Sequence, residues 1–183
     1  MALIASVSGI RGTIGGSVGS NLTPVDAVAF ASAYGQWLRT QAGGDRRLRI
    51  ALGRDARISG EALSDLVVST LRFQGIDVLD LGLSTTPTVE MMVPWEGCDG
   101  GIILTASHNP AQYNGIKLCL SKARPIGKES GLLTIENFVR EGSPIALRNV
   151  GVEKHRDMLN EYVDHLLSLV DVTKIRPLKI IVD

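Results

Sequence analysis

Apolar runs and stop signals alternate along the chain as strands and helices do in an α/β protein. Short apolar runs predict strands at residues 3–7, 48–53, 76–81, 101–104 and 116–120. Longer segments with apolar residues at helical spacing predict helices at 24–39, 59–73, 86–93, 127–140 and 152–170. The run 101–104 has no polar residue, as expected of a strand covered on both faces. We therefore expect an α/β fold with a mixed, mostly parallel sheet flanked by helices.

Local signals mark the ends of several elements. Thr23 is the expected N-cap of the first helix, with Pro24 at its first position and Asp26 three residues after the cap. One face of that helix is expected to pack inward; its members are Val25, Val28, Ala29, Ser32, Ala33 and Trp37. Ser59 is the expected cap of the next helix. Glycines suggest that residues 8–21 form a loop, that Gly43-Gly44 and Gly75 end helices, and that Asn114-Gly115 makes a turn.

The C-terminal part of the chain suggests a second domain. The helix expected at 152–170 has an apolar stripe that we interpret as core packing: Leu159, Tyr162, Val163, Leu166, Leu167 and Val170. Residues 178–183 look like a new buried strand that ends as it begins. We therefore expect one domain at 1–150, followed by a linker helix and the first strand of another domain at 151–183, in a truncated chain.

Composition excludes several classes of protein. Lys and Arg together number 19, as do Asp and Glu, and this balance argues against a nucleic-acid-binding or anionic-membrane surface. No apolar run approaches the ~20 residues that span a bilayer, and no export signal is evident. Cys98 and Cys119 form neither a metal-binding spacing nor a disulfide framework. We expect a cytoplasmic protein with free thiols, in which the sequon at Asn21 is coincidental.

The clearest candidate for chemistry is the loop Thr105-Ala106-Ser107-His108-Asn109-Pro110, which directly follows the buried strand. Sites in open α/β sheets gather at the carboxyl ends of strands. The Gly-x-Ser-x-Gly elbow of acyl hydrolases is missing, and neighbouring residues such as Ser107 and His108 do not normally face each other. A bare serine hydroxyl could instead carry a phosphoryl group. On their own, these residues favour an ordinary turn, because Ser, Asn and Pro are common turn formers.

Four motifs in order resemble those of the α-D-phosphohexomutases, the superfamily of phosphoglucomutase, phosphomannomutase and phosphoglucosamine mutase. The serine loop 105–110 resembles the phosphoserine loop of that family. The others are Ser8-Gly9-Ile10-Arg11-Gly12, Gly53-Arg54-Asp55-Ala56-Arg57-Ile58-Ser59-Gly60 and Tyr113-Asn114-Gly115-Ile116-Lys117. The resemblance covers residues 8 to about 120. It implies an enzyme that interconverts 1-phospho and 6-phospho hexoses through a phosphoserine and a hexose 1,6-bisphosphate.

The resemblance also implies roles for individual residues. Ser107 would carry the phosphoryl group and ligate Mg²⁺ through that phosphate, and Arg11 would clamp the group with its planar donors. Lys117 would act as general acid or base, and His108 would donate a hydrogen bond or assist proton transfer. Ser8, Arg11, Asn109 and Lys117 would bind the phosphate groups of a hexose phosphate. Surface ion pairs are the alternative reading of Arg11 and Lys117.

Other charged and glycine-rich segments are expected to be structural. Arg54, Asp55 and Arg57 are interpreted as an ion-pair scaffold for the site loops rather than as catalytic groups. The glycines of the first loop form neither Gly-x-Gly-x-x-Gly nor a P-loop, so nucleotide binding is not indicated.

Three functional hypotheses remain at this stage. The leading one is the N-terminal domain of a phosphohexomutase; the others are a non-catalytic phosphosugar-binding or assembly module and a phosphoserine-using hydrolase of unrelated fold. The hydrolase is disfavoured because the sequence has no metal cluster of Asp and His.

The family's Asp-rich Mg²⁺ loop, its sugar-specificity loop and its C-terminal phosphate loop have no counterpart before Asp183. We therefore expect this chain alone to be inactive. Its sugar preference is open among glucose, mannose and glucosamine phosphates, with the first loop leaning towards glucosamine-type members.

Overall fold

A computed structural model of the chain describes residues 3–43, 45–142 and 148–181. The described residues form one seven-stranded sheet with the strand order β1-β2-β6-β5-β3-β4-β7. The strands are β1 (Ile4–Ser6), β2 (Gly9–Thr13), β3 (Arg49–Arg54), β4 (Asp77–Leu83), β5 (Gly100–Leu104), β6 (Tyr113–Leu120) and β7 (Glu153–His155). The helices are α1 (Pro24–Ala42), α2 (Gly60–Phe73), α3 (Thr86–Trp95), α4 (Leu133–Glu141) and α5 (Leu159–Leu169). Strands β5, β3, β4 and β7 run parallel, whereas β5-β6, β6-β2 and β2-β1 are antiparallel, so the expected mixed sheet is confirmed.

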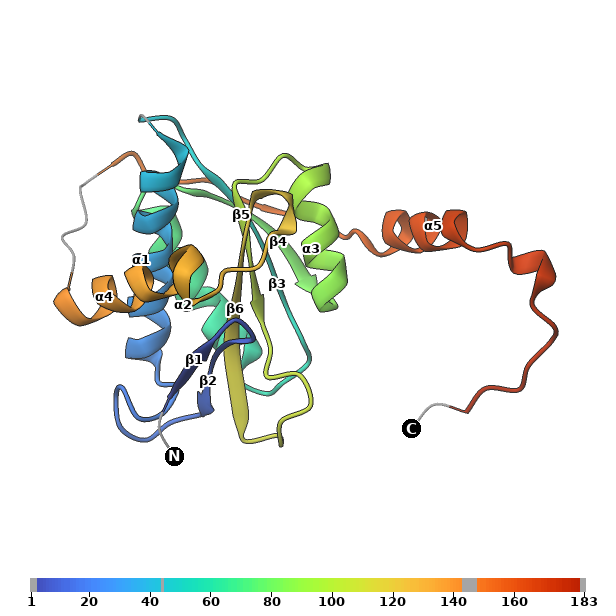
Figure 1. The fold of residues 1–183 in the computed structure, drawn as a ribbon, viewed down its shortest axis with the longest axis horizontal. Helices are drawn as coiled ribbons and strands as arrows, with labels where there is room; N and C mark the ends of the chain where they lie inside the picture. The colour runs from blue at the N-terminus through green and yellow to red at the C-terminus, as the bar shows by residue number, and fades with distance from the viewer. Residues whose placement is uncertain (1–2, 44, 143–147, 182–183) are drawn as a thin grey trace.

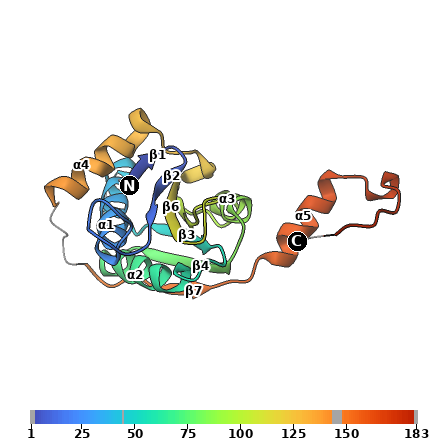
Figure 2. The same cartoon turned by 90° about the horizontal axis from the view of Figure 1, so that it is seen from below.

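Helices cover both faces of the sheet (Figure 1). Helices α1, α2 and α4 lie on one face and α3 lies on the other, as the second view shows (Figure 2). Strand β5 is buried along its whole length, as its apolar sequence predicts. Ile102 and Leu104 belong to the larger core under α1 and α2, and Ile103 points into the smaller core under α3.

Helix α1 begins as its sequence predicts but buries a different face. The Thr23 side chain accepts a hydrogen bond from the Asp26 amide, and the Asp26 carboxylate accepts one from the Thr23 amide, forming a capping box. Ala33 and Trp37 are buried as expected, but Val25 and Val28 are 59% and 38% exposed. The buried face instead contains Ala27, Phe30, Ala31, Tyr34 and Leu38. Because α1 contacts α2 and α4 as well as the sheet, its buried surface is wider than one stripe.

Two segments interpreted as irregular are paired strands. Strand β2 lies within the loop expected at 8–21, and the Asn114-Gly115 pair lies inside β6 rather than in a turn. Close packing explains the glycines there. A Cβ on Gly115 would lie 2.7 Å from the Thr105 carbonyl oxygen, and one on Gly12 would lie 2.8 Å from the Leu22 amide nitrogen.

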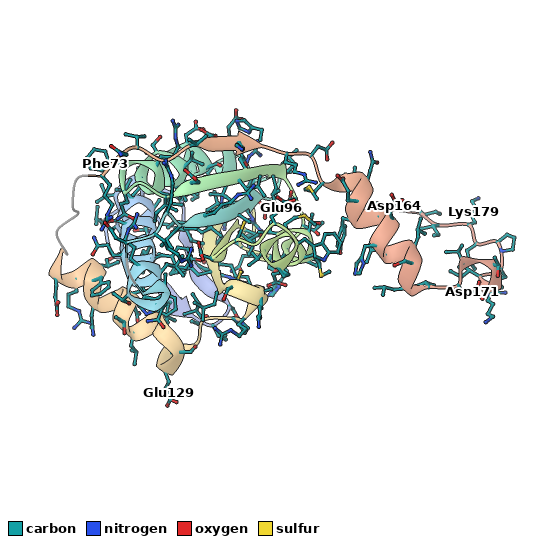
Figure 3. The ribbon with its side chains drawn as sticks, turned by 90° about the horizontal axis from the view of Figure 1, so that it is seen from above. Phe73, Glu96, Glu129, Asp164, Asp171 and Lys179 are labelled. Atoms are coloured by element: carbon teal, nitrogen blue, oxygen red, sulfur yellow. The ribbon has the colours of Figure 1, made fainter. Side chains whose placement is uncertain are left out.

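The C-terminal third differs most from expectation. The helix expected at 127–140 is a π-helical turn (Lys128–Leu132) followed by α4. The helix expected at 152–170 is divided into β7, which pairs with β4, and α5. No residue of α5 is buried, so its apolar stripe is not core packing. Figure 1 shows α5 and the chain after it extending away from the sheet, and Asp164, Asp171 and Lys179 mark that segment in Figure 3.

The strand expected at 178–183 is not formed in its described part. Residues 178–181 are exposed and unpaired in any sheet, and residues 182–183 lie outside the described residues, as does Gly44 at the end of α1. In the described segment after β7, several contacts tie α5 to the main body. Met158, directly before α5, is buried in the smaller core, and the Arg156 amide donates to the Asp80 carbonyl oxygen at 2.9 Å. Trp95 and His165 meet edge to face with ring centroids 4.8 Å apart, and Arg156 pairs with Glu96.

Candidate active site

The sequence motifs meet at one end of the sheet. Parallel strands β3 and β5 both end there, so residues 54–57 and the loop 105–112 emerge side by side. The Asp55 amide donates to the Leu104 carbonyl oxygen at 3.0 Å, which joins the two strand ends. Strand β2 brings the first motif to the same place, because Arg11 lies opposite Gly115 on β6.

Ser107 lies at an exposed position with an unusual backbone. Its φ angle is 55°, in the left-handed region that few residues other than glycine adopt. Its amide donates to Thr105 Oγ1 at 2.9 Å, and its Oγ lies 3.4 Å from His108 Nδ1. The expectation that adjacent Ser107 and His108 would not face each other is therefore wrong, because their side chains lie within hydrogen-bond distance. Strain of this kind is concentrated at functional sites.

Arg57 holds this loop in place. Its side chain is only 12% exposed and is oriented by Asp55 Oδ2, 3.1 Å from Nε. Its two terminal nitrogens donate to four carbonyl oxygens of the loop, at 2.8–2.9 Å: those of Ser107, Asn109, Pro110 and Tyr113. Asp55 also accepts from Thr105 Oγ1 at 2.7 Å. The contacts of Asp55 and Arg57 are those of the expected scaffold. For Arg54 the corresponding contact is a 3.9 Å pair with exposed Glu61.

A second support lies under the loop. Ser59 is the N-cap residue of α2, but its side chain makes no capping hydrogen bond, contrary to expectation. Its Oγ instead accepts from Asn114 Nδ2 at 2.9 Å, and the Asn114 side-chain oxygen accepts from the Gly115 amide. Asn114 is fully buried, so this bond fixes β6 to the start of α2.

Arg11 lies next to the serine loop. Its Nη1 donates to Asn109 Oδ1 at 3.3 Å and its Nη2 donates to the Ser8 carbonyl oxygen at 2.9 Å. Its Nε is buried and has no hydrogen-bond partner in the described part of the chain. Arg11 and Asn109 contribute to a cavity of about 250 Å³ whose wall also includes Ile4, Ser6, Ser8, Gly9, Gly12, Thr13 and Tyr113. An unpartnered guanidinium nitrogen beside a cavity is suited to binding an anion.

Lys117 lies on the same side of the sheet as Arg11 but is engaged elsewhere. Its Nζ is 2.7 Å from Glu90 Oε1 of helix α3, and both side chains are partly buried. No hydrogen bond joins Lys117 to Ser107 among the described residues. The structure therefore brings together Ser8, Arg11, Ser107, His108 and Asn109, and leaves Lys117 paired with Glu90. Glu90 was missed from sequence because it is 27 residues away and on another element.

The described residues do not form a Mg²⁺ site around Ser107. The nearby carboxylate, Asp55, is already bound by Arg57 and Thr105, and Mg²⁺ requires several hard oxygen ligands. Elsewhere in the described ranges, one group of three potential ligands lies at the β4-β7 edge: Asp80, Glu153 and His155. There, His155 Nδ1 is 3.0 Å from Asp80 and Nε2 is 3.4 Å from Glu153. Strand β3 lies between the β4-β7 pair and β5, which leads into the Ser107 loop.

The two cysteines are not nucleophiles. Both are free and buried. Burial raises the pKa of Cys98 to about 11 and that of Cys119 to about 12. The reactive thiolate is therefore scarce at neutral pH.

Fold and site together define a class: an α/β/α domain that presents one strained serine, fixed by an arginine clamp, beside a second arginine with an unpartnered nitrogen. The chain belongs to the phosphoglucomutase/phosphomannomutase family, since residues 3–145 match the model of its alpha/beta/alpha domain I. No helix among the described residues is long and apolar enough to cross a membrane.

Known proteins agree with this assignment. The chain is 35% identical over 170 residues to a phosphomannomutase of Vibrio cholerae, matching 93% of this chain and 36% of that protein. It is 35% identical over 168 residues to a phosphoglucomutase/phosphomannomutase of Thermococcus kodakarensis, matching 90% of this chain and 36% of that protein. A phosphoglucomutase/phosphomannomutase family structure from Burkholderia thailandensis superimposes with a TM-score of 0.73 at 26% identity, covering 89% of this chain and 35% of that chain. The chain thus spans about a third of the length of these relatives.

Proposed function

We propose that this chain is the phosphoserine-bearing domain of a phosphohexomutase and that Ser107 is the residue phosphorylated. The observation that carries the proposal is the arrangement of the 105–110 loop. Ser107 is exposed in a left-handed conformation, and the four carbonyl contacts of Arg57 fix the backbone at Ser107 and after it. On the other side of Ser107, Thr105 donates to Asp55. A phosphoryl carrier needs this fixed position because phosphoryl transfer depends mainly on placing and neutralising the group.

The proposed reaction moves one phosphoryl group in each half. In the first, the bond between phosphorus and Ser107 Oγ breaks while a bond forms to a free hydroxyl of the hexose phosphate, giving a hexose 1,6-bisphosphate. The hydroxyl proton passes to a base, and Ser107 Oγ takes up a proton. The second half returns the other phosphoryl group of the sugar to Ser107. The net result is exchange between the 1- and 6-phosphates.

Individual side chains have distinct proposed parts. Arg11 binds the phosphoryl oxygens through its Nη1 and Nη2 donors, which now contact Asn109 and Ser8. His108, 3.4 Å from Ser107 Oγ, donates to that oxygen or accepts its proton. Lys117 serves the sugar hydroxyl, and to reach it the ammonium group must turn away from Glu90. Ser8 and Asn109 bind phosphate together with Arg11.

The proposed enzyme requires parts beyond the described residues. Among the described residues, no set of carboxylates around Ser107 would hold Mg²⁺ together with the serine phosphate. We propose that residues 1–150 are the phosphoserine domain and that 151–183 lead towards a second domain. In support, the chain spans about a third of its relatives. On its own the chain should not turn over hexose phosphate, and the cytoplasmic location stays a prediction.

The proposed substrate is mannose or glucose phosphate. The support is the naming of the relatives above, which are phosphomannomutases and phosphoglucomutase/phosphomannomutases. The first loop, at residues 8–12, resembles glucosamine-type members of the family, but the names of these relatives do not support glucosamine phosphate as the substrate.

Phosphopeptide mapping tests the proposal. The complete protein that contains this chain is incubated with glucose 1,6-bisphosphate and Mg²⁺ and analysed by intact mass and peptide mapping. We expect one added phosphate on the peptide containing Ser107, and its loss in Ser107→Ala. The matched control Ser168→Ala, on exposed helix α5, should be labelled as the wild type is. A phosphate on another residue, with full mutase activity in Ser107→Ala, would overturn the assignment.

A further inference from the structure

A second cavity lies at the opposite end of the sheet from Ser107. It has a volume of about 660 Å³ and is lined by Arg39, Asp45, Arg46, Arg47, Gly75, Arg148 and Asn149. Arg47 precedes β3 and Gly75 precedes β4, whereas the serine loop follows the end of β5. Because these three strands are parallel, the two sites are separated by the length of the strands. The proposed mutase chemistry does not use this cavity.

Four guanidinium groups line the cavity, against a single lining carboxylate, Asp45. Three of the four are held by carboxylates: Arg46 by Asp99, Arg47 by Asp77 and Arg148 by Asp45. These pairs fix the direction of the guanidinium planes, which lowers the entropy lost when a ligand binds.

Arg39 supplies the charge in excess. It forms no ion pair within the described ranges, and its Nη2 donates to the Gln74 carbonyl oxygen at 2.5 Å. Partial burial, followed by repulsion from the charge of Arg148, lowers the pKa of Arg39. Attraction to Asp45 offsets this repulsion only in part, so a bound anion would stabilise both guanidinium groups further.

The backbone keeps Arg148 at the cavity. Gly75 ends α2 with a φ angle of 73°, and a Cβ at that position would lie 2.9 Å from both Arg148 Cβ and the Asn149 carbonyl oxygen. Only glycine therefore allows the segment at 148–149 to pack against the end of α2. Asp77 then accepts from Arg47 and from the Val152 amide, at 2.9 Å and 2.7 Å, which anchors the same segment to β4.

We propose that this arginine cavity binds a small anion that carries phosphate groups, at a site separate from Ser107. Arginine guanidinium groups match phosphate oxygens in geometry and charge. Arg39 has no carboxylate partner in the described ranges, and Arg148 binds Asp45 through Nη1 alone, so both have further donors for an anion. The volume exceeds what one phosphate fills, so a diphosphate or a phosphorylated metabolite fits the site better than inorganic phosphate alone.

The test is a titration of the 183-residue chain, followed by amide NMR at constant ionic strength. Sodium pyrophosphate should shift the Gly75 and Asn149 amides in a saturable manner, with a Kd of about 1 mM or lower. Arg39→Gln and Arg148→Gln should each weaken binding by about tenfold, as expected for loss of a charge-assisted contact. Arg140→Gln, an exposed arginine at the end of α4, is the matched control and should leave the Kd unchanged.

Separate arms distinguish the sources of phosphate. Inorganic phosphate and glucose 1,6-bisphosphate are titrated in the same way. The anion with the lowest Kd, measured from the shift of the Gly75 amide, identifies the class of ligand. Arg148→Gln alters a surface side chain, so it keeps the test valid even if Arg39→Gln reduces folding. Three results would overturn the site: no saturation by about 20 mM pyrophosphate, a Kd in both arginine variants equal to that of the wild type, or shifts confined to residues 105–113. None of these results would affect Ser107 phosphorylation, which is measured independently.

Discussion

Replacing Arg57 with lysine should loosen the serine loop while leaving the sheet folded. Lysine keeps the charge but cannot direct two nitrogens at four carbonyl oxygens. Of the four hydrogen bonds that Arg57 donates, those to Tyr113 and Asn109 are partly buried, whereas those to Ser107 and Pro110 are exposed to water. Water can replace the exposed pair, so most of the cost comes from the partly buried pair.

The expected magnitude follows from this difference. Hydrogen bonds from a charged group contribute about 1.5–3 kcal/mol each, and a single lysine ammonium can recover one of the two partly buried bonds. We therefore expect the free energy of unfolding to fall by about 2–3 kcal/mol in Arg57→Lys. A domain of this kind has a stability of about 5–15 kcal/mol, so the variant should still fold.

Urea denaturation and amide exchange measure the two consequences. The amides of Asn109 and Tyr113 donate within the loop, to Ala106 and Pro110. In Arg57→Lys these amides should exchange faster by a larger factor than the amides of β3 and β5. Arg124→Lys, a change at an exposed arginine, is the control and should alter neither quantity. Unchanged stability together with unchanged exchange at Asn109 and Tyr113 would refute the clamp.

Three further predictions follow from named contacts. In the complete enzyme, Arg11→Ala and Lys117→Ala should each lower kcat by about 10²-fold or more with folding retained, measured in a coupled mutase assay; near-normal kcat would leave Lys117 as an ion-pair partner of Glu90 and Arg11 as a structural hydrogen-bond donor. The pKa of Cys119 is about 12 in the folded chain and about 8.5 when the thiol is exposed. Between these values the folded state binds more protons than the unfolded state. The contribution of Cys119 to the free energy of unfolding is therefore full below about pH 8 and falls as the pH rises towards 12. In urea denaturation, the free energy of unfolding of Cys119→Ala should fall less over that pH range than that of the wild type. Identical dependence on pH in the two proteins would contradict this role of Cys119. Gly131→Ala should destabilise the chain by about 2 kcal/mol or more, because the new Cβ would lie 2.1 Å from Trp37 Cζ2 and the glycine has a φ angle of 143°; an unchanged melting temperature would show that the π-helical turn repacks freely.

Features that depend on neighbours in sequence were predictable. The capping box at Thr23 needs only residues 23–26, and the burial of β5 follows from its unbroken apolar run. The loop containing Ser107 was identified because it follows that strand and carries a motif of six residues. The scaffold role of Asp55 and Arg57 was expected because the segment 53–60 resembles a motif that supports the site loops in the phosphohexomutase family.

Features that depend on distant partners were not predictable. Strand β2 looked like a glycine-rich loop because its pairing with β6 joins residues about 100 positions apart. The pairing of Lys117 with Glu90 and the cavity between Arg39 and Arg148 likewise join separate elements. The apolar spacing at 159–170 predicted a helix correctly, but the core packing expected of that helix is wrong, because no residue of α5 is buried.

The sequence by itself therefore determined the α/β class, the capped start of α1, the buried central strand and the identity of the serine loop. The tertiary structure alone decided which side chains meet that loop, where the arginine cavity forms, and that α5 lies away from the sheet. Local pattern sets backbone preference and which face of an element is apolar. Contacts such as Arg57 to Asn109 depend on how the strands are ordered in the sheet, and that order is a property of the whole fold.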